Sequence, residues 1–250
     1  MNVMLEQLTG LIERARTGNL NAFSALCIRD AHGSPIDLAE FHLVVNAFID
    51  YCWQQNPPLS AGVLAPWRHG KSLLSVIGRA AHAIGLNPEV RIRLICADDR
   101  EAVLRVAAVR RVIESRRYRR VFPYVRPKHG EWLKHQFTVE RSSIGPDPTL
   151  AAAGVFAVEA GGGHDIIMFD DLVTYQNTYL APAIRPAIYD TVTSVWLRRV
   201  DPGARICAVG TAWHYDDCNH RLRRQEHLGQ WRWLIVRVSD KFDKLEARVE

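Results

Sequence analysis

The apolar residues near the start of the chain recur with helical spacing. They predict a helix over residues 2–17 that ends at Gly18 and Asn19, and its apolar side is formed by Val3, Met4, Leu8, Leu11, Ile12 and Ala15. Residues 19–36 lack such a period and are predicted to be irregular. A second helix is predicted from an Asp37 cap to about Gln55, where Pro57 and Pro58 stop it.

From residue 60 onward, short apolar runs alternate with amphipathic segments. The predicted strands are Ser60–Ala65, Arg91–Ala97, Trp132–Arg141, Asp165–Phe169, Arg205–Val209 and Trp231–Val238. The predicted helices are Ser72–Ile84, Arg100–Ser115 and Pro182–Arg198. A polar tail follows Val238. Strands that alternate with helices indicate an α/β fold with a mostly parallel sheet.

Composition narrows the class of protein. The chain has 250 residues, of which 48% are hydrophobic and 24% charged, as in globular proteins. It contains no apolar run long enough to span a membrane. Its five cysteines are scattered without a CxxC pair, which argues against a disulfide framework or zinc ribbon and favours a reducing cytosol. The net charge of +5 suits a phosphate-bearing partner.

The junction between the strand at 60–65 and the next helix reads APWRHGKS. It matches the phosphate-binding pattern GxxxxGK[ST], except that Ala65 replaces the first glycine. Gly70 permits close approach of phosphates, Lys71 can reach their oxygens, and the Ser72 hydroxyl can ligate Mg²⁺. For this segment alone, the alternative is a surface turn with a chance GKS. The predicted nucleotide-binding residues are Pro66, Trp67, Arg68, His69, Gly70, Lys71, Ser72 and Leu73.

A second segment, DIIMFDD at 165–171, is an apolar strand that ends in two carboxylates. We expect this strand to lie beside the phosphate-loop strand. Asp170 would then hold Mg²⁺ through water, and Asp171 would act as the base toward the attacking water. The alternative is a strand that ends in a solvated Asp-Asp turn. Both motifs together, in this order and at strand ends, predict nucleotide binding.

A third segment, VGTAWHYDD at 209–217, follows a further strand. A polar residue at this strand end would face the γ-phosphate at the carboxyl edge of the sheet, and Thr211 occupies that position. The alternative is an ordinary loop with a packed Trp213.

Together, APWRHGKS, DIIMFDD and GTAWHYDD resemble the Walker A, Walker B and coupling motifs of phage terminase large subunits. The stretch IESRRYRRVFP (Ile113–Pro123) resembles the same family, and the resemblance covers roughly Phe41 to Leu222. It implies a P-loop NTPase fold of the ASCE, RecA-like type, with a helical appendage at 1–36 and an ATPase domain at 37–250.

The family's activity is ATP-driven threading of viral double-stranded DNA into a procapsid. The resemblance therefore implies ATP and Mg²⁺ as cofactors. It implies DNA, a portal protein and a small terminase subunit as partners, assembly as a homo-oligomeric ring, and the cytoplasm of an infected bacterium as location. Lys71 and Arg68 would contact or sense phosphates, Ser72 and Asp170 would hold Mg²⁺, and Asp171 would be the catalytic carboxylate. The coupling residues would be Thr211, Ala212 and Trp213.

Two departures from the family pattern stand out. Only a short, charged remainder follows Asp217, so we expect no nuclease activity from this chain. The arginine that many members supply to a neighbouring active site is replaced by Gly162, for which Arg141 or an arginine of the 116–120 cluster is a candidate substitute.

Two further questions stay open from the sequence. The basic run from Arg105 to Lys128 is either a phosphate-binding stripe for DNA or a solvated helix face. The function has two rivals: a helicase-like or repair ATPase, and a non-hydrolysing nucleotide-binding ring component.

Overall fold

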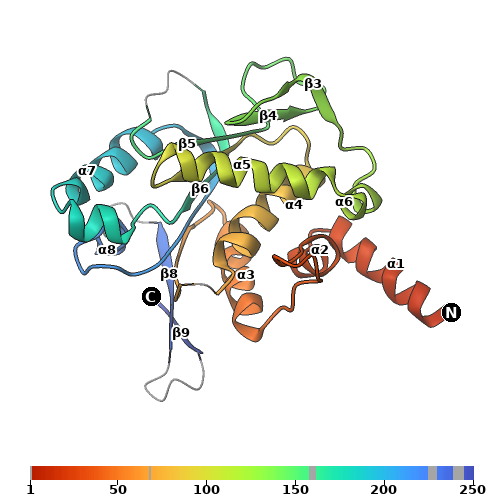
Figure 1. Ribbon diagram of the computed structural model, residues 1–250, viewed down its shortest axis with the longest axis horizontal. Helices are drawn as coiled ribbons and strands as arrows, with labels where there is room; N and C mark the ends of the chain where they lie inside the picture. Colours follow the sequence, from red (N-terminus) through yellow and green to blue (C-terminus); the bar gives the residue numbers. More distant parts are fainter. Residues whose placement is uncertain (1, 68, 158–161, 225–229, 239–244) are drawn as a thin grey trace.

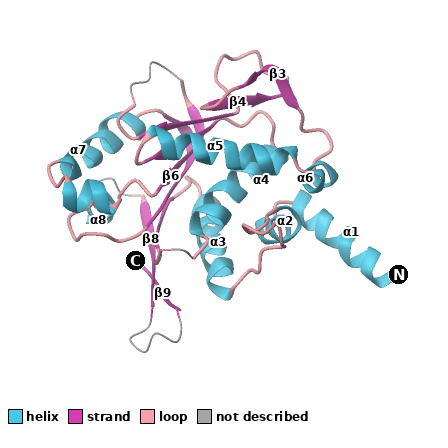
Figure 2. Ribbon diagram, in the orientation of Figure 1, coloured by secondary structure: helices cyan, strands magenta, loops and turns pink. Residues whose placement is uncertain are grey.

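The computed structural model describes residues 2–67, 69–157, 162–224, 230–238 and 245–250. Its centre is a nine-stranded sheet of order β3-β4-β5-β2-β6-β7-β1-β8-β9 (Figures 1 and 2). The parallel strands are β1 (Ser60–Leu64), β2 (Ile92–Cys96), β5 (Leu150–Gly154), β6 (His164–Asp170), β7 (Val200–Gly210) and β8 (Trp231–Val238). The antiparallel strands β3 (Pro127–Trp132), β4 (Gln136–Val139) and β9 (Leu245–Val249) lie at the two ends. The expected α/β class with a mostly parallel sheet is confirmed.

Helices cover both faces of the sheet. One face packs against α2 (Leu20–Cys27), α3 (Glu40–Trp53), α4 (Arg79–Leu86), α5 (Asp99–Glu114) and α6 (Arg116–Val121). The other face packs against α7 (Ile184–Thr191), a π-helical segment at Val192–Trp196 and α8 (Cys218–Arg224). Two more π-helical segments, Ser72–Gly78 and Gln176–Leu180, follow β1 and β6. Side chains of the central strands alternate between the two cores, so the strands are buried on both faces.

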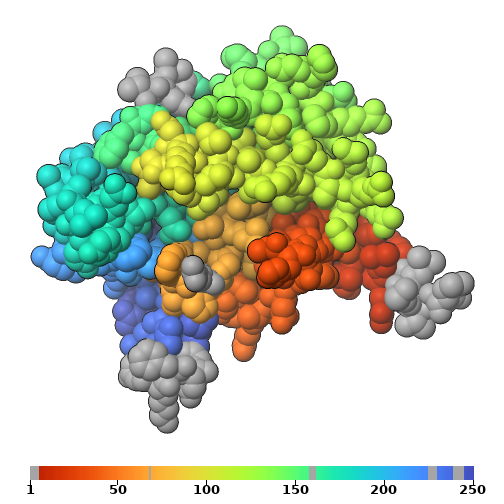
Figure 3. All heavy atoms as spheres, viewed as in Figure 1, coloured from red at the N-terminus to blue at the C-terminus, as the bar shows by residue number. Residues whose placement is uncertain are grey.

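The first helix, α1 (Asn2–Arg16), extends away from the main body in Figure 1. Its C-terminal end packs on the core: Ala15 is buried, and Arg16 donates hydrogen bonds to the carbonyls of Arg120 and Val121 in α6. These segments, far apart in sequence, lie side by side in Figure 3. The predicted domain boundary at residue 36 stays a prediction.

Several sequence expectations about local structure are wrong. The segment 19–36 contains a helix, because Asn19 caps α2 by accepting a hydrogen bond from the amide of Ala22 and Phe23 anchors α2 in the core. Asp37 does not cap α3, which begins after Ala39.

The sheet also differs from the expectation at its ends. The single strand expected at 132–141 is the hairpin β3-β4, and the alanine-rich β5 was missed. The tail after Val238 contains β9, which pairs with β8. None of the helices in the described ranges is long and apolar enough to cross a lipid bilayer.

The strand order corrects one expectation that concerns the site. The strand next to β1 is β7, and β6 with its terminal carboxylates lies one strand further away. The last residues of β7, from Cys207 to Gly210, are buried, and they pair with β1 on one side and with β6 on the other.

Candidate functional site

The three sequence motifs meet at the carboxyl edge of the parallel sheet. β1 leads into the segment 65–72, β7 ends at Gly210 and β6 ends at Asp170. The amide of Ala65 donates to the carbonyl of Gly210 at 3.0 Å, and the amide of Asp171 donates to the carbonyl of Val209 at 2.9 Å. These bonds hold the loops that follow the three strands next to one another.

The phosphate-loop segment bends at Gly70, which has a φ of +70°. A side chain there would be strained, and its Cβ would lie 3.2 Å from His42 Nε2 on α3. His42 Nε2 also lies 2.9 Å from the carbonyl oxygen of His69. The first turn of α3 therefore supports the loop from behind, and the predicted site residues had not included His42.

The Lys71 side chain is 4% exposed and lies between two motifs. Its ammonium donates to Thr211 Oγ1 at 2.9 Å and lies 3.5 Å from Asp171 Oδ1. A buried ammonium needs such partners, because desolvation disfavours its charge. The structure thus brings together three of the predicted residues from three strand ends.

Ser72 and Asp170 form a second pair. The Ser72 hydroxyl donates to Asp170 Oδ1 at 2.8 Å, and the Asp170 carboxylate is fully buried. Mg²⁺ prefers oxygen ligands and typically takes one or two from the protein, with phosphates and waters completing its shell. A hydroxyl and a carboxylate that converge at the mouth of a phosphate loop fit this donor set.

Asp171 has a φ of 46°, in the left-handed region that few residues other than glycine adopt. Among the residues that the structure describes, it is the one non-glycine residue with positive φ. Burial and the neighbouring Asp170 carboxylate raise the pKa of Asp171 above its usual value, and Lys71 opposes this effect. The strained backbone turns this carboxylate away from β6 and toward Lys71.

Arg105 is a site residue that the motifs did not reveal. From α5, its Nε donates to Asp170 Oδ2, and its Nη1 lies 3.2 Å from Glu101 one turn earlier. Burial disfavours its charge, but Asp170 outweighs that effect and raises the pKa of Arg105. Neither interpretation of the basic run, DNA stripe or solvated face, holds for this arginine.

Other arginines of that run do face solvent. Arg116, Arg117, Arg119, Arg120 and Arg126 are exposed. Arg110 lies over the ring of Trp132, with its Cζ 5.1 Å from the ring centre. Tyr118, by contrast, is a core residue whose hydroxyl donates to the carbonyl of Ala81 at 3.0 Å. The choice between a DNA stripe and a solvated face stays open for the exposed arginines.

A cavity of about 620 Å³ opens beside these groups, a size typical of small-molecule sites. Asp170, Asp171, Arg105, Glu101 and Thr211 contribute to its polar wall. Its rim is aromatic: Trp67 and Tyr175 are exposed, and the ring of Tyr175 lies edge-on to Trp213, 6.1 Å away. The carbonyl of Trp213 also accepts a hydrogen bond from the hydroxyl of Tyr179 at 2.6 Å.

The remaining predicted residues are less informative. Arg68 lies outside the described residues. Pro66 is half-buried, Ala212 is exposed, and the side chain of Leu73 packs against the core, so only its backbone could serve a ligand. All of these assignments stay predictions.

The candidate arginine substitutes, Arg141 and the 116–120 cluster, would act in a neighbouring active site, and that role stays a prediction. Gly162 has a φ of +86° and lies near Asp147 and His164. Arg141 contacts the carbonyls of Gly145 and Asp147 within its own loop. It is therefore engaged locally.

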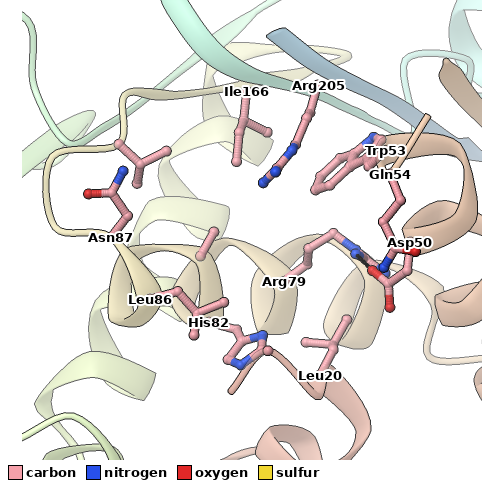
Figure 4. Close-up of a pocket in the computed structure, with 13 residues that line it drawn as sticks. Leu20, Asp50, Trp53, Gln54, Arg79, His82, Leu86, Asn87, Ile166 and Arg205 are labelled. Carbon is pink, nitrogen blue, oxygen red and sulfur yellow. Dashed lines mark hydrogen bonds and ion pairs between the residues drawn. The ribbon is translucent and has the colours of Figure 1, made fainter. Parts of the chain in front are cut away.

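A second cavity, of about 250 Å³, lies near the start of β6 (Figure 4). Arg205 points into it from the sheet, while Arg79 reaches toward Asp50 below Trp53. Burial lowers the pKa of His82 in its wall to about 4, so this histidine is neutral. None of the predicted site residues lines this cavity.

The nine-stranded mostly parallel sheet, the helices on both faces and the loop–helix junction after β1 define a P-loop NTPase fold. No protein-family model matches the chain, and no curated protein sequence matches it. Among solved structures, the fold is similar to the crystal structure of the HK97 bacteriophage large terminase. The TM-score is 0.52, the sequence identity is 12%, and the match covers 83% of this chain. It covers 39% of the terminase chain, so this chain spans about two-fifths of the terminase's length. At 12% sequence identity, this similarity shows a shared fold alone.

Proposed function

We propose that this chain is the ATPase part of a phage DNA-packaging motor, a terminase large subunit that hydrolyses ATP to move viral double-stranded DNA into a procapsid. The observation that carries the proposal is the meeting of Lys71, Thr211 and Asp171 with the Ser72–Asp170 pair, from three neighbouring strand ends. The fold shared with the HK97 large terminase supports the same assignment.

The residues divide the work as follows. The loop around Gly70 and the helix start behind it offer amide donors to phosphates, and Lys71 gives the phosphate oxygens a positive charge. Ser72 and Asp170 would hold Mg²⁺, which when bound neutralises charge on the phosphate oxygens. Asp171 orients and deprotonates the attacking water, a role that its raised pKa and its position beside Lys71 suit. Most of the rate enhancement would come from positioning the water and the phosphate and from stabilising the charge of the transition state.

The coupling to DNA would start at Thr211. Once phosphates draw Lys71 away, the hydroxyl of Thr211 loses its partner, and the segment with Ala212 and Trp213 is free to shift. The exposed arginines of α6 are the candidate DNA contacts, and such contacts weaken steeply with added salt. The portal, the small subunit and other copies of the chain in a ring would be the protein partners, in the cytoplasm of the infected host.

The test is phosphate release from Mg-ATP by the wild-type chain and by Lys71→Ala, over a wide range of protein concentrations. We expect turnover that Lys71→Ala abolishes. Lys128→Ala, which removes an exposed lysine paired with Glu131, is the matched control and should retain turnover. A rate per subunit that rises with concentration indicates that a neighbour completes the site, and a constant rate indicates self-sufficient subunits.

Wild-type protein that binds ATP without releasing phosphate at any concentration would contradict the proposal and support the ring-component rival. Turnover that requires single-stranded rather than double-stranded DNA would support the helicase-like rival.

A further inference from the structure

The buried carboxylate of Asp170 has both of its oxygens engaged. Ser72 donates to Oδ1 and Arg105 donates to Oδ2, and the carboxylate has no exposed surface. A charged carboxylate in such a place needs a compensating cation. Arg105, from a helix on another part of the chain, is that cation in this structure.

The guanidinium and a metal ion compete for this carboxylate. Ser72 and Asp170 are the oxygen donors that suit Mg²⁺, and Arg105 is bound to the same carboxylate. Two cations on one buried carboxylate repel each other strongly, because the interior screens charge poorly. Arrival of the metal with a nucleotide therefore displaces Arg105.

The displaced guanidinium remains next to the cavity. Arg105 lines the same wall as Asp171 and Thr211, and Glu101 tethers it at 3.2 Å from one turn earlier on α5. The cavity is where the nucleotide brings new negative charge, and a guanidinium pairs with phosphate oxygens through two parallel hydrogen bonds.

We infer that Arg105 is an exchangeable counter-ion, bound to Asp170 in the nucleotide-free protein and to the terminal phosphate when a magnesium-bound nucleoside triphosphate occupies the cavity. The inference rests on the proposed function and deepens it.

The test compares the affinities of ADP and of a non-hydrolysable ATP analogue, both with saturating Mg²⁺, by calorimetry on the full chain. We expect the wild-type protein to prefer the triphosphate. Arg105→Gln should lose at least tenfold of that preference without any weakening of its affinity for ADP. Arg110→Gln, on the same helix and over Trp132, is the matched control and should behave as the wild type.

An unchanged preference in Arg105→Gln would overturn the inference and leave the proposed ATPase intact. A wild-type protein that binds neither nucleotide would overturn both. If Arg105→Gln does not fold, Arg105→Lys carries the test, because it keeps the charge but not the two parallel hydrogen bonds. A loss of threefold or more of the preference supports the inference, and an unchanged preference overturns it.

A second readout needs no nucleotide. Binding of Mn²⁺ to the free protein, followed by the electron paramagnetic resonance signal of the unbound ion, should be at least threefold tighter in Arg105→Gln than in the wild type. Equal affinities would overturn the competition between Arg105 and the metal.

Discussion

The two edges of the parallel sheet both carry charged side chains, but they use them differently. At the carboxyl edge, Lys71 and Asp170 are almost completely buried, and each is held by groups that a phosphate or a metal could replace. At the opposite edge, Arg91 is 28% exposed and bridges carboxylates that come from three segments of the chain. These carboxylates belong to Asp147, Asp165 and Asp201.

This difference distinguishes the proposed ligand site from a structural cross-link. The guanidinium of Arg91 joins the starts of β6 and β7 to the loop before β5, and its partners are carboxylates of the protein itself. At the carboxyl edge, Lys71 and Asp170 contact groups that, in the proposed function, an anion and a cation would replace. Both edges are charged, so charge alone does not distinguish the proposed site. Its distinguishing feature is that the charged groups are buried and contact groups that a ligand could replace.

The largest expected effect is at Asp171. Asp171→Asn should lower the rate constant of ATP hydrolysis by about 10²–10⁴-fold, because the amide cannot accept the proton of the attacking water. Asparagine tolerates the left-handed backbone at this position, so the fold should persist. Asp165→Asn at the opposite edge is the control and should change the rate less than about threefold, because it leaves the groups at the carboxyl edge in place. Equal losses of the hydrolysis rate in the two variants would contradict the difference between the two edges of the sheet.

The next effect concerns His82, in the wall of the cavity in Figure 4. Burial lowers its pKa to about 4 in the folded protein, from 6.5 in an unfolded chain. Between these values the unfolded chain binds a proton that the folded protein does not, so stability falls as pH drops from 6.5 to 4. The loss is roughly 3 kcal/mol for this residue. Urea unfolding at several pH values should show a shallower dependence in His82→Gln, and a dependence identical to wild type would contradict the neutral buried state.

A smaller effect is expected for the Arg91 cross-link. Arg91→Met should lower the free energy of unfolding by about 1–2 kcal/mol. The effect is small because the carboxylates that share this cation are partly exposed, so water screens the charge that they are left with. The rate of ATP hydrolysis per folded molecule should remain within about twofold of wild type. A rate that collapses while the protein stays folded would show that this edge takes part in catalysis.

The smallest effect is at Thr211. Thr211→Val removes one hydrogen bond to Lys71, worth about 1 kcal/mol; because ATP is proposed to break this bond, the substitution should lower KM for ATP about fivefold. Thr191→Val on α7, whose hydroxyl only contacts the carbonyl of Ala187, is the comparison variant. Steady-state kinetics that do not distinguish the two would remove Thr211 from the site.

The sequence predicts the parallel core well because its signals are local. Apolar runs bounded by turn residues give β1, β2, β6, β7 and β8 within a few residues, apart from an earlier start of β7. β5 is missed because Leu150–Gly154 is mostly alanine and glycine, which carry little strand preference; its burial against β2 is a tertiary effect. Similarly, β9 depends on pairing with β8, which no local pattern indicates.

The residues of the candidate site also fall into two groups, those that local motifs predict and those that only the packing reveals. Lys71, Ser72, Asp170 and Thr211 belong to motifs at strand ends, and their positions follow from the fold. Arg105 lies in the middle of a helix, 65 residues from Asp170 in sequence, and looks like any arginine of an amphipathic helix. Its contact appears only when α5 is laid across the sheet. The placement of β7 between β1 and β6 likewise follows from packing and not from motif order.

The antiparallel strands at the two ends of the sheet have a consequence for how copies of the chain can associate. β3 carries Pro127, which offers no amide donor, and Lys128, while β9 carries Glu246 and Arg248. Proline and charged residues on an outer strand discourage a second chain from adding to the sheet by backbone pairing. Copies of this chain are therefore expected to meet through loops and helices, an arrangement that would keep the subunits of the proposed ring from aggregating into continuous β-structure.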